Sequence, residues 1–140
     1  MINLEEANIL LMRSCLNGYW TFTWIGLLAN IAAIPFIAFV VSSGPPLQWA
    51  NLWSAIFLGW PAAVVGIVAA SGLFAERRWG VIMSIIALSM AVSGTLPYGI
   101  YRLIDEGDLF GLSGLSLLIA LLNMIALIYW CRPGHRRIRL

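Results

Sequence analysis

The stretch LSGLSLLIALLNMIALIYWC, residues 112–131, contains no charged side chain. A helix that rises 1.5 Å per residue needs roughly 20 apolar residues to cross a hydrocarbon core about 30 Å thick. The stretch meets that requirement, and Asn123 is the only strongly polar residue in its interior. These residues are therefore predicted to form a transmembrane helix.

Three similar stretches precede it, at about residues 20–41, 52–74 and 79–101. The 140 residues are 61% hydrophobic and 10% charged, whereas soluble proteins average roughly 45–50% apolar and 25% charged residues. We therefore expect an all-α fold, an integral membrane four-helix bundle that forms one domain over residues 1–140. Pro35 and Pro61 are predicted to bend the first and second spans.

Residues 3–19 form a segment of their own. Asn3 can cap a helix, Glu6 follows three positions later, and apolar residues recur at helical spacing at Leu4, Ala7, Leu11, Cys15 and Tyr19. This pattern predicts a short amphipathic helix lying on the membrane surface. The alternative is that these residues extend the first span.

Arginine residues are distributed unequally between the two sides of the membrane. Four crossings place both termini and the turn at residues 75–78 on one side, which then carries seven arginines, Arg13, Arg77, Arg78, Arg132, Arg136, Arg137 and Arg139, against Arg102 on the other. Short loops rich in arginine stay in the cytoplasm. We expect both termini there, and the layout, which is similar to that of many small bacterial membrane proteins, suggests the bacterial inner membrane.

Small residues recur along the second and third spans. They are Gly59, Ala63, Gly66 and Ala70 in the second span and Gly80, Ser84, Ala87 and Ala91 in the third. Small side chains let transmembrane helices approach closely and pack by van der Waals contact. The two spans are therefore predicted to form a tight antiparallel hairpin, and the small faces are candidate sites for other membrane subunits.

Polar residues within the spans give little support for a transport path or a catalytic site. No span contains an ionisable residue, although proton and ion pathways usually need one at membrane depth. The candidates to line a pore between several copies are Asn30, Ser54, Ser89, Ser93, Thr95 and Asn123. The alternative role of these side chains is hydrogen bonding within or between helices.

The remaining reactive residues are few and scattered. His135 lies among tail arginines, Cys15 and Cys131 are expected to be small apolar fillers, and Asp105, Glu106 and Asp108 are expected to form a solvated loop. These residues form no metal-binding or catalytic pattern. We therefore expect no enzyme activity, no cofactor, no metal site and no nucleic-acid partner.

The basic tail at residues 132–140 has three possible roles. Arg132, Arg136, Arg137 and Arg139 can anchor the topology, bind anionic lipid headgroups or contact an acidic partner. Since no catalytic pattern is present, the sequence suggests a non-catalytic accessory or structural subunit of a larger membrane complex. The alternative is a small self-assembling transporter or channel for a neutral or lipidic solute.

The predicted orientation can be tested with reporter fusions. A reporter that is active only in the cytoplasm should be active after Leu140 and inactive when inserted at Gly44 or Gly107, because arginine-rich segments resist translocation. Replacing the tail arginines together with Arg77 and Arg78 should scramble the orientation, whereas replacing Arg102 should not. A non-cytoplasmic C-terminal reporter would contradict the orientation.

Overall fold

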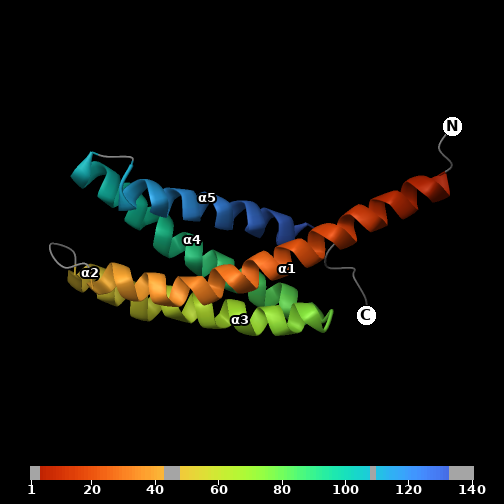
Figure 1. Ribbon diagram of the computed structural model, residues 1–140, viewed down its shortest axis with the longest axis horizontal. Helices are drawn as coiled ribbons and strands as arrows, with labels where there is room; N and C mark the ends of the chain where they lie inside the picture. The colour runs from red at the N-terminus through yellow and green to blue at the C-terminus, as the bar shows by residue number, and fades with distance from the viewer. Residues whose placement is uncertain (1–3, 43–47, 108–109, 133–140) are drawn as a thin grey trace.

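The computed structural model describes residues 4–42, 48–107 and 110–132, and for residues 4–17, 48 and 106 it describes the backbone alone. The helices are α1 (Leu4–Ser42), α2 (Gln48–Ser54), the π-helical segment η1 (Ala55–Gly59), α3 (Trp60–Phe74), α4 (Arg78–Glu106) and α5 (Leu112–Cys131) (Figure 1). Four spans are long and apolar enough to cross a membrane: Gly18–Ser42, Trp49–Phe74, Arg78–Asp105 and Leu112–Cys131. The predicted all-α four-helix membrane bundle is confirmed.

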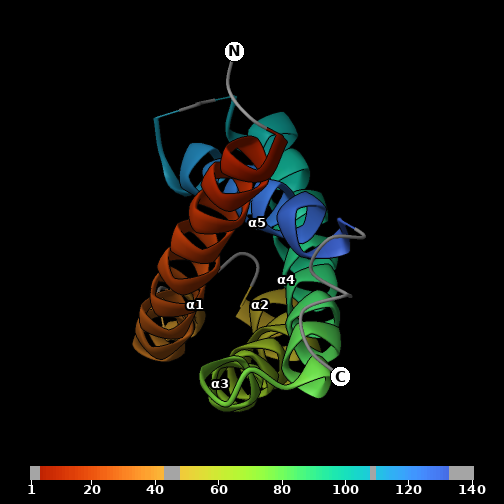
Figure 2. The same cartoon turned by 90° about the vertical axis from the view of Figure 1, so that its right-hand side faces the viewer.

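The four spans pack against one another in the order in which they occur in the chain. Helix α3 contacts both α1 and α4, and α4 also packs along α5, as the view along the long axis of the molecule shows (Figure 2). We call the end that contains the turn between α3 and α4 the Ala75 end, and the opposite end the Arg102 end. At the Ala75 end α1 also meets α5, because Tyr19 contacts Trp130 there.

The N-terminal segment is not a separate element. Helix α1 runs unbroken from Leu4 to Ser42, so residues 4–17 extend the first span, as the alternative interpretation expected. Gly18 is the only glycine near the expected junction, and one glycine lowers helix stability by only about 1 kcal/mol. Asn3, the expected cap, lies outside the described residues. Pro35 also lies inside this continuous helix.

Two other boundaries differ from the prediction. The second span begins with α2 at Gln48 rather than at residue 52, and directly before Pro61 it widens into the π-helical segment η1. Helix α4 continues to Glu106, so Asp105 and Glu106, which were expected in a solvated loop, are helical. The helix ends at Gly107, whose φ of 65° and N–H bond to the Leu103 carbonyl form a C-terminal cap. The charges of Asp105 and Glu106 suggested a loop, but the helix continues through them because its C-terminal cap is Gly107.

The turn between α3 and α4 brings two backbones into contact. The N–H groups of Arg77 and Glu76 donate to the carbonyls of Gly72 (2.8 Å) and Leu73 (3.0 Å), the bond pattern of a Schellman cap. Glu76 takes the left-handed conformation of that cap, with φ of 51°. A Cβ atom on Gly80 would lie 2.5 Å from the Gly72 carbonyl carbon. The hairpin therefore needs glycine at position 80.

Alanine substitution at two glycines should have opposite effects on stability. Gly80→Ala should destabilise the chain by about 1–3 kcal/mol, because the added methyl group pushes α4 away from α3. Gly26→Ala is the control, since nothing lies within 4 Å of a Cβ at that position, and it should be neutral or stabilise by up to about 1 kcal/mol. Thermal unfolding in detergent measures both effects. Equal midpoints for the two variants would contradict the close approach.

Candidate functional site

The predicted small-residue faces lie inside the bundle. Six of the residues are buried and two, Gly59 and Ala91, are half-buried. Their neighbours differ in part from the prediction, because Gly59 lies against Ile37 and Gly66 against Asn30, both on α1. The second span thus uses small residues to approach the first span as well as the third. These small residues therefore pack helices of this chain against one another.

The polar residues of the spans mostly bond to their own helices. Asn30 donates to the Gly26 carbonyl (2.7 Å) and Asn123 to the Ile119 carbonyl (2.8 Å). Ser89 and Ser93 also donate to carbonyls of α4, and both lie on its exposed side. These four residues do not share one surface within a single copy. A pore built from several copies remains a prediction.

Hydrogen bonds also join different helices. The Tyr19 hydroxyl donates to the Leu73 carbonyl (2.7 Å), linking α1 to α3, and the Ser116 hydroxyl donates to the Thr95 carbonyl (2.8 Å), linking α5 to α4. Another buried side chain has no such bond: the Oδ1 atom of Asn51 has no hydrogen-bond partner among the described residues. Asn51 lies four positions before Ala55, which is also buried. Residues four positions apart lie on the same side of a helix, so this spacing could have indicated from the sequence that the Asn51 amide faces the interior of the bundle.

Aromatic rings close the bundle at the Ala75 end. Tyr19 meets Trp130 edge to face at 5.4 Å between ring centroids, and Phe22 stacks on Tyr129 at 4.1 Å. Both pairs join α1 to α5. Trp130 is buried. A periodicity argument could not show this contact, because it joins residues more than 100 positions apart.

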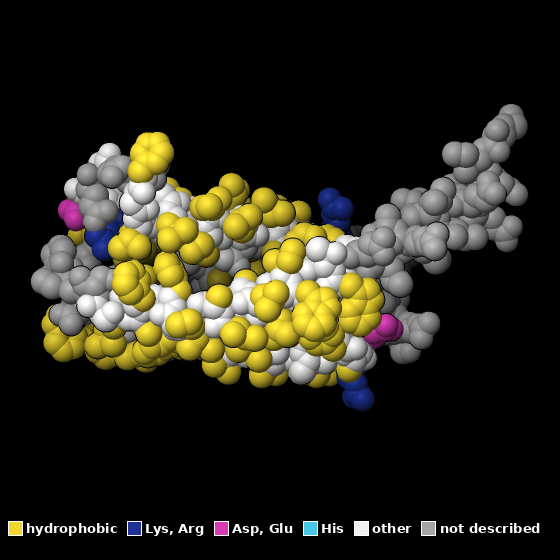
Figure 3. Space-filling model, viewed as in Figure 1, with side chains coloured by type: hydrophobic (Ala, Val, Ile, Leu, Met, Phe, Trp, Pro, Cys, Tyr) yellow, Lys and Arg dark blue, Asp and Glu magenta, His cyan; other side chains and the backbone are white. Residues whose placement is uncertain are grey.

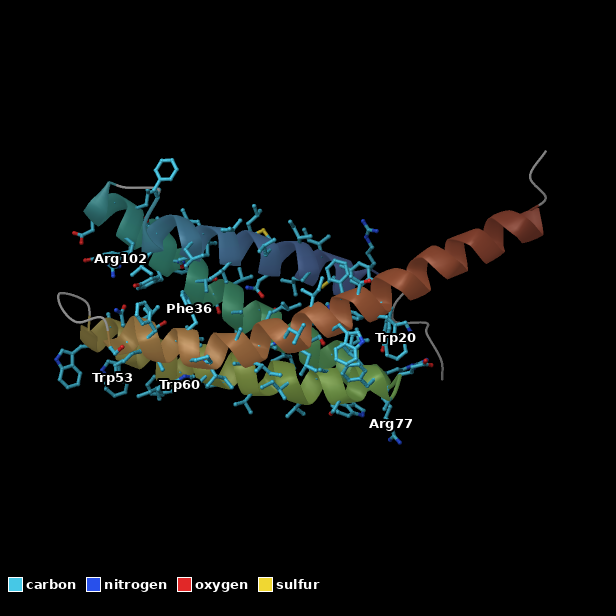
Figure 4. All side chains as sticks on the ribbon, in the orientation of Figure 1. Trp20, Phe36, Trp53, Trp60, Arg77 and Arg102 are labelled. Carbon is cyan, nitrogen blue, oxygen red and sulfur yellow. The ribbon has the colours of Figure 1, made fainter. Side chains whose placement is uncertain are left out.

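Beyond these rings, one side of α1 is open. No residue of α1 from Trp24 to Ser42 is buried, and a Cβ atom on Gly26 would have no neighbour within 4 Å. Figure 3 shows this face of the molecule hollowed between α1 and α5, and Figure 4 shows Phe36 between these two helices. We call the side of α1 formed by Gly26, Ala29, Ala33 and Phe36 the open face.

The charged residues lie at the two ends of the bundle. Arg102 donates to the Tyr98 hydroxyl (3.1 Å) and its guanidinium lies over that ring, 5.7 Å from the centroid. Asp105, Arg132 and Cys131 are exposed. Asp108, His135, Arg136, Arg137 and Arg139 lie outside the described residues, as do the side chains of Cys15 and Glu106. Within the described part of the chain, His, Cys, Asp and Glu form no group that could hold a metal ion.

Two serine substitutions should show that a hydrogen bond between helices contributes more to stability than one within a single helix. Ser116→Ala removes the link from α5 to α4 and should cost about 0.6–1.7 kcal/mol, the range for polar contacts between membrane helices. Ser93→Ala removes a bond within α4 at an exposed position and should change the unfolding free energy by less than about 0.5 kcal/mol. Unfolding of both variants by denaturing detergent is the measurement. Equal losses would contradict this distinction.

Comparison with known proteins gives no identification. No protein-family model, curated protein or solved structure matches the chain.

Proposed function

We propose that this chain is a non-catalytic accessory subunit of a larger membrane protein complex, and that the open face of α1 contributes to the interface. The observation that carries the proposal is the space beside Gly26, where no atom lies within 4 Å of a Cβ position. We also propose that the complex lies in the bacterial inner membrane with both termini of this chain in the cytoplasm. The arginine distribution supports that orientation.

The open face has the composition of a helix contact. Lipid chains can cover large apolar side chains such as the exposed Ile25 and Leu28 of α1. A glycine facing lipid instead lowers helix stability and offers no side chain to pack. Gly26, Ala29 and Ala33 would allow a partner helix to approach the α1 backbone closely. This argument favours a protein neighbour over lipid at the open face.

The length of α1 supports the same proposal. Its 39 residues reach about 58 Å at 1.5 Å per residue, whereas the predicted first span begins only at about residue 20. Residues 4–17 thus continue for about 21 Å, and Figure 1 shows them projecting past the rest of the bundle. A helix this short is marginally stable alone in water. Contact with a partner or with the membrane surface would stabilise it.

Extraction of the native membrane in mild detergent tests the proposal. The chain should migrate in a complex much larger than its own 15.4 kDa, and affinity purification should recover the same partner proteins at fixed ratios. Migration as a lone chain would overturn the proposal.

Substitutions on α1 should locate the interface. Gly26→Leu should reduce partner recovery about tenfold or more while leaving the isolated chain folded, because position 26 is open within the chain. Leu28→Phe is the control, since Leu28 is exposed on α1 outside the open face, and it should leave recovery unchanged. Unfolding midpoints of the purified variants check their folding. Full recovery with Gly26→Leu would show that the open face is not part of the interface.

A further inference from the structure

The second span contains a break in its backbone hydrogen bonds. The Trp60 N–H donates to the carbonyl of Ala55, five residues back, rather than to Ile56, four residues back. The next residue, Pro61, has no N–H group to give to Phe57. The carbonyls of Ile56 and Phe57 therefore lose the donors that a regular α-helix would provide.

The break lies on the outside of the bundle. The inner side of η1 is formed by Leu58 and Gly59, which contact Gly94 of α4 and Ile37 of α1. Ile56 and Phe57 are 42% and 62% exposed. Figure 4 shows Trp53 and Trp60 projecting from this edge of the molecule, away from α5. Within the described part of the chain, the side chains beside the break thus stay exposed.

The break also lies well inside a span that is long and apolar enough to cross a membrane. From Gln48, where α2 begins, the helix advances about 14 Å to reach Phe57. Acyl chains carry no hydrogen-bond donor, and an unsatisfied carbonyl in hydrocarbon is costly. Prolines are tolerated in membrane helices because neighbouring groups supply the missing donor. No side chain among the described residues donates to the Ile56 or Phe57 carbonyl.

We infer that this break is a docking point for a transmembrane helix of a partner protein, whose hydroxyl or amide side chain donates to the carbonyl of Ile56 or Phe57. The rings of Trp53 and Phe57, stacked at 5.3 Å and 11°, form an aromatic surface beside it against which the partner helix packs. Such rings are enriched at protein interfaces. The inference rests on the proposed function, because it requires a partner. It adds a second contact, separate from the open face of α1.

Pro61→Ala tests the docking point in the native complex. Alanine supplies an N–H that can pair with the Phe57 carbonyl, so the acceptor is satisfied within the helix. Partner recovery after mild detergent extraction should fall about tenfold, while the isolated chain keeps its helix content. Pro97→Ala is the matched control, because it also restores an N–H inside a membrane helix but does so in α4, away from η1, and it should leave recovery unchanged.

The outcomes separate the two proposals. A wild-type chain that migrates alone contradicts the accessory function itself. A wild-type complex that survives Pro61→Ala intact contradicts only the docking point.

A second measurement does not require the Pro61→Ala variant to fold. The carbonyls of Ile56 and Phe57 are labelled with carbon-13 and oxygen-18, one in each of two wild-type samples, and each amide I band is recorded in the native complex and in the isolated chain. One of the two bands should lie at lower frequency in the complex, because a hydrogen bond from the partner weakens the carbonyl bond. Equal frequencies in the complex and the isolated chain for both carbonyls would overturn the inference.

Discussion

Every backbone N–H and C=O group that lies in hydrocarbon must find a partner within the protein, and this requirement governs the whole structure. Four continuous helical spans satisfy it almost completely. Polar side chains are satisfied in the same way, by bonding within their own helix. Those of Thr23, Asn30, Ser84 and Asn123 each donate a hydrogen bond to a backbone carbonyl of that helix. The places where the backbone departs from this pattern are therefore informative. The main departure is η1, where Trp60 bonds five residues back and Pro61 donates nothing.

Packing between the spans depends on close approach at small residues rather than on burial of large ones. Within α3 and α4, Gly72 meets Gly80 backbone to backbone, and Gly66 leaves room for the Asn30 side chain. Large apolar residues such as Ile86 and Leu122 instead face outward. This distribution is the reverse of a soluble core and is expected where lipid is as apolar as leucine. The two central helices are α3 and α4, since α1 packs on α3 and α5 packs on α4.

The sequence predicted the features that have a local cause. Charge-free stretches of sufficient length gave the four spans, and the fourth span ends at the predicted residues. Boundaries set by distant or subtle signals were placed less well: α4 continues through Arg102 and Asp105 because its cap is Gly107, and α1 absorbs the expected surface helix. The small-residue pattern identified Gly59 and Gly66 as packing positions but assigned them to the wrong neighbour, because spacing along one helix does not show which helix lies opposite. The Tyr19 and Trp130 contact had no local signal at all.

The open side of the molecule follows from the way α1 is held. At the Ala75 end it is fixed on two sides, to α3 by the Tyr19 hydrogen bond to Leu73 and to α5 by the Phe22 stack on Tyr129. Toward the Arg102 end it keeps its contact with η1 through Ile37 but no residue after Thr23 is buried. Helix α1 is thus anchored at the Ala75 end, while the open face along its remaining length is not covered by the described residues of this chain. Such an arrangement presents a preformed surface whose position is set by rigid contacts, so a partner helix could bind it without first displacing a helix of this chain.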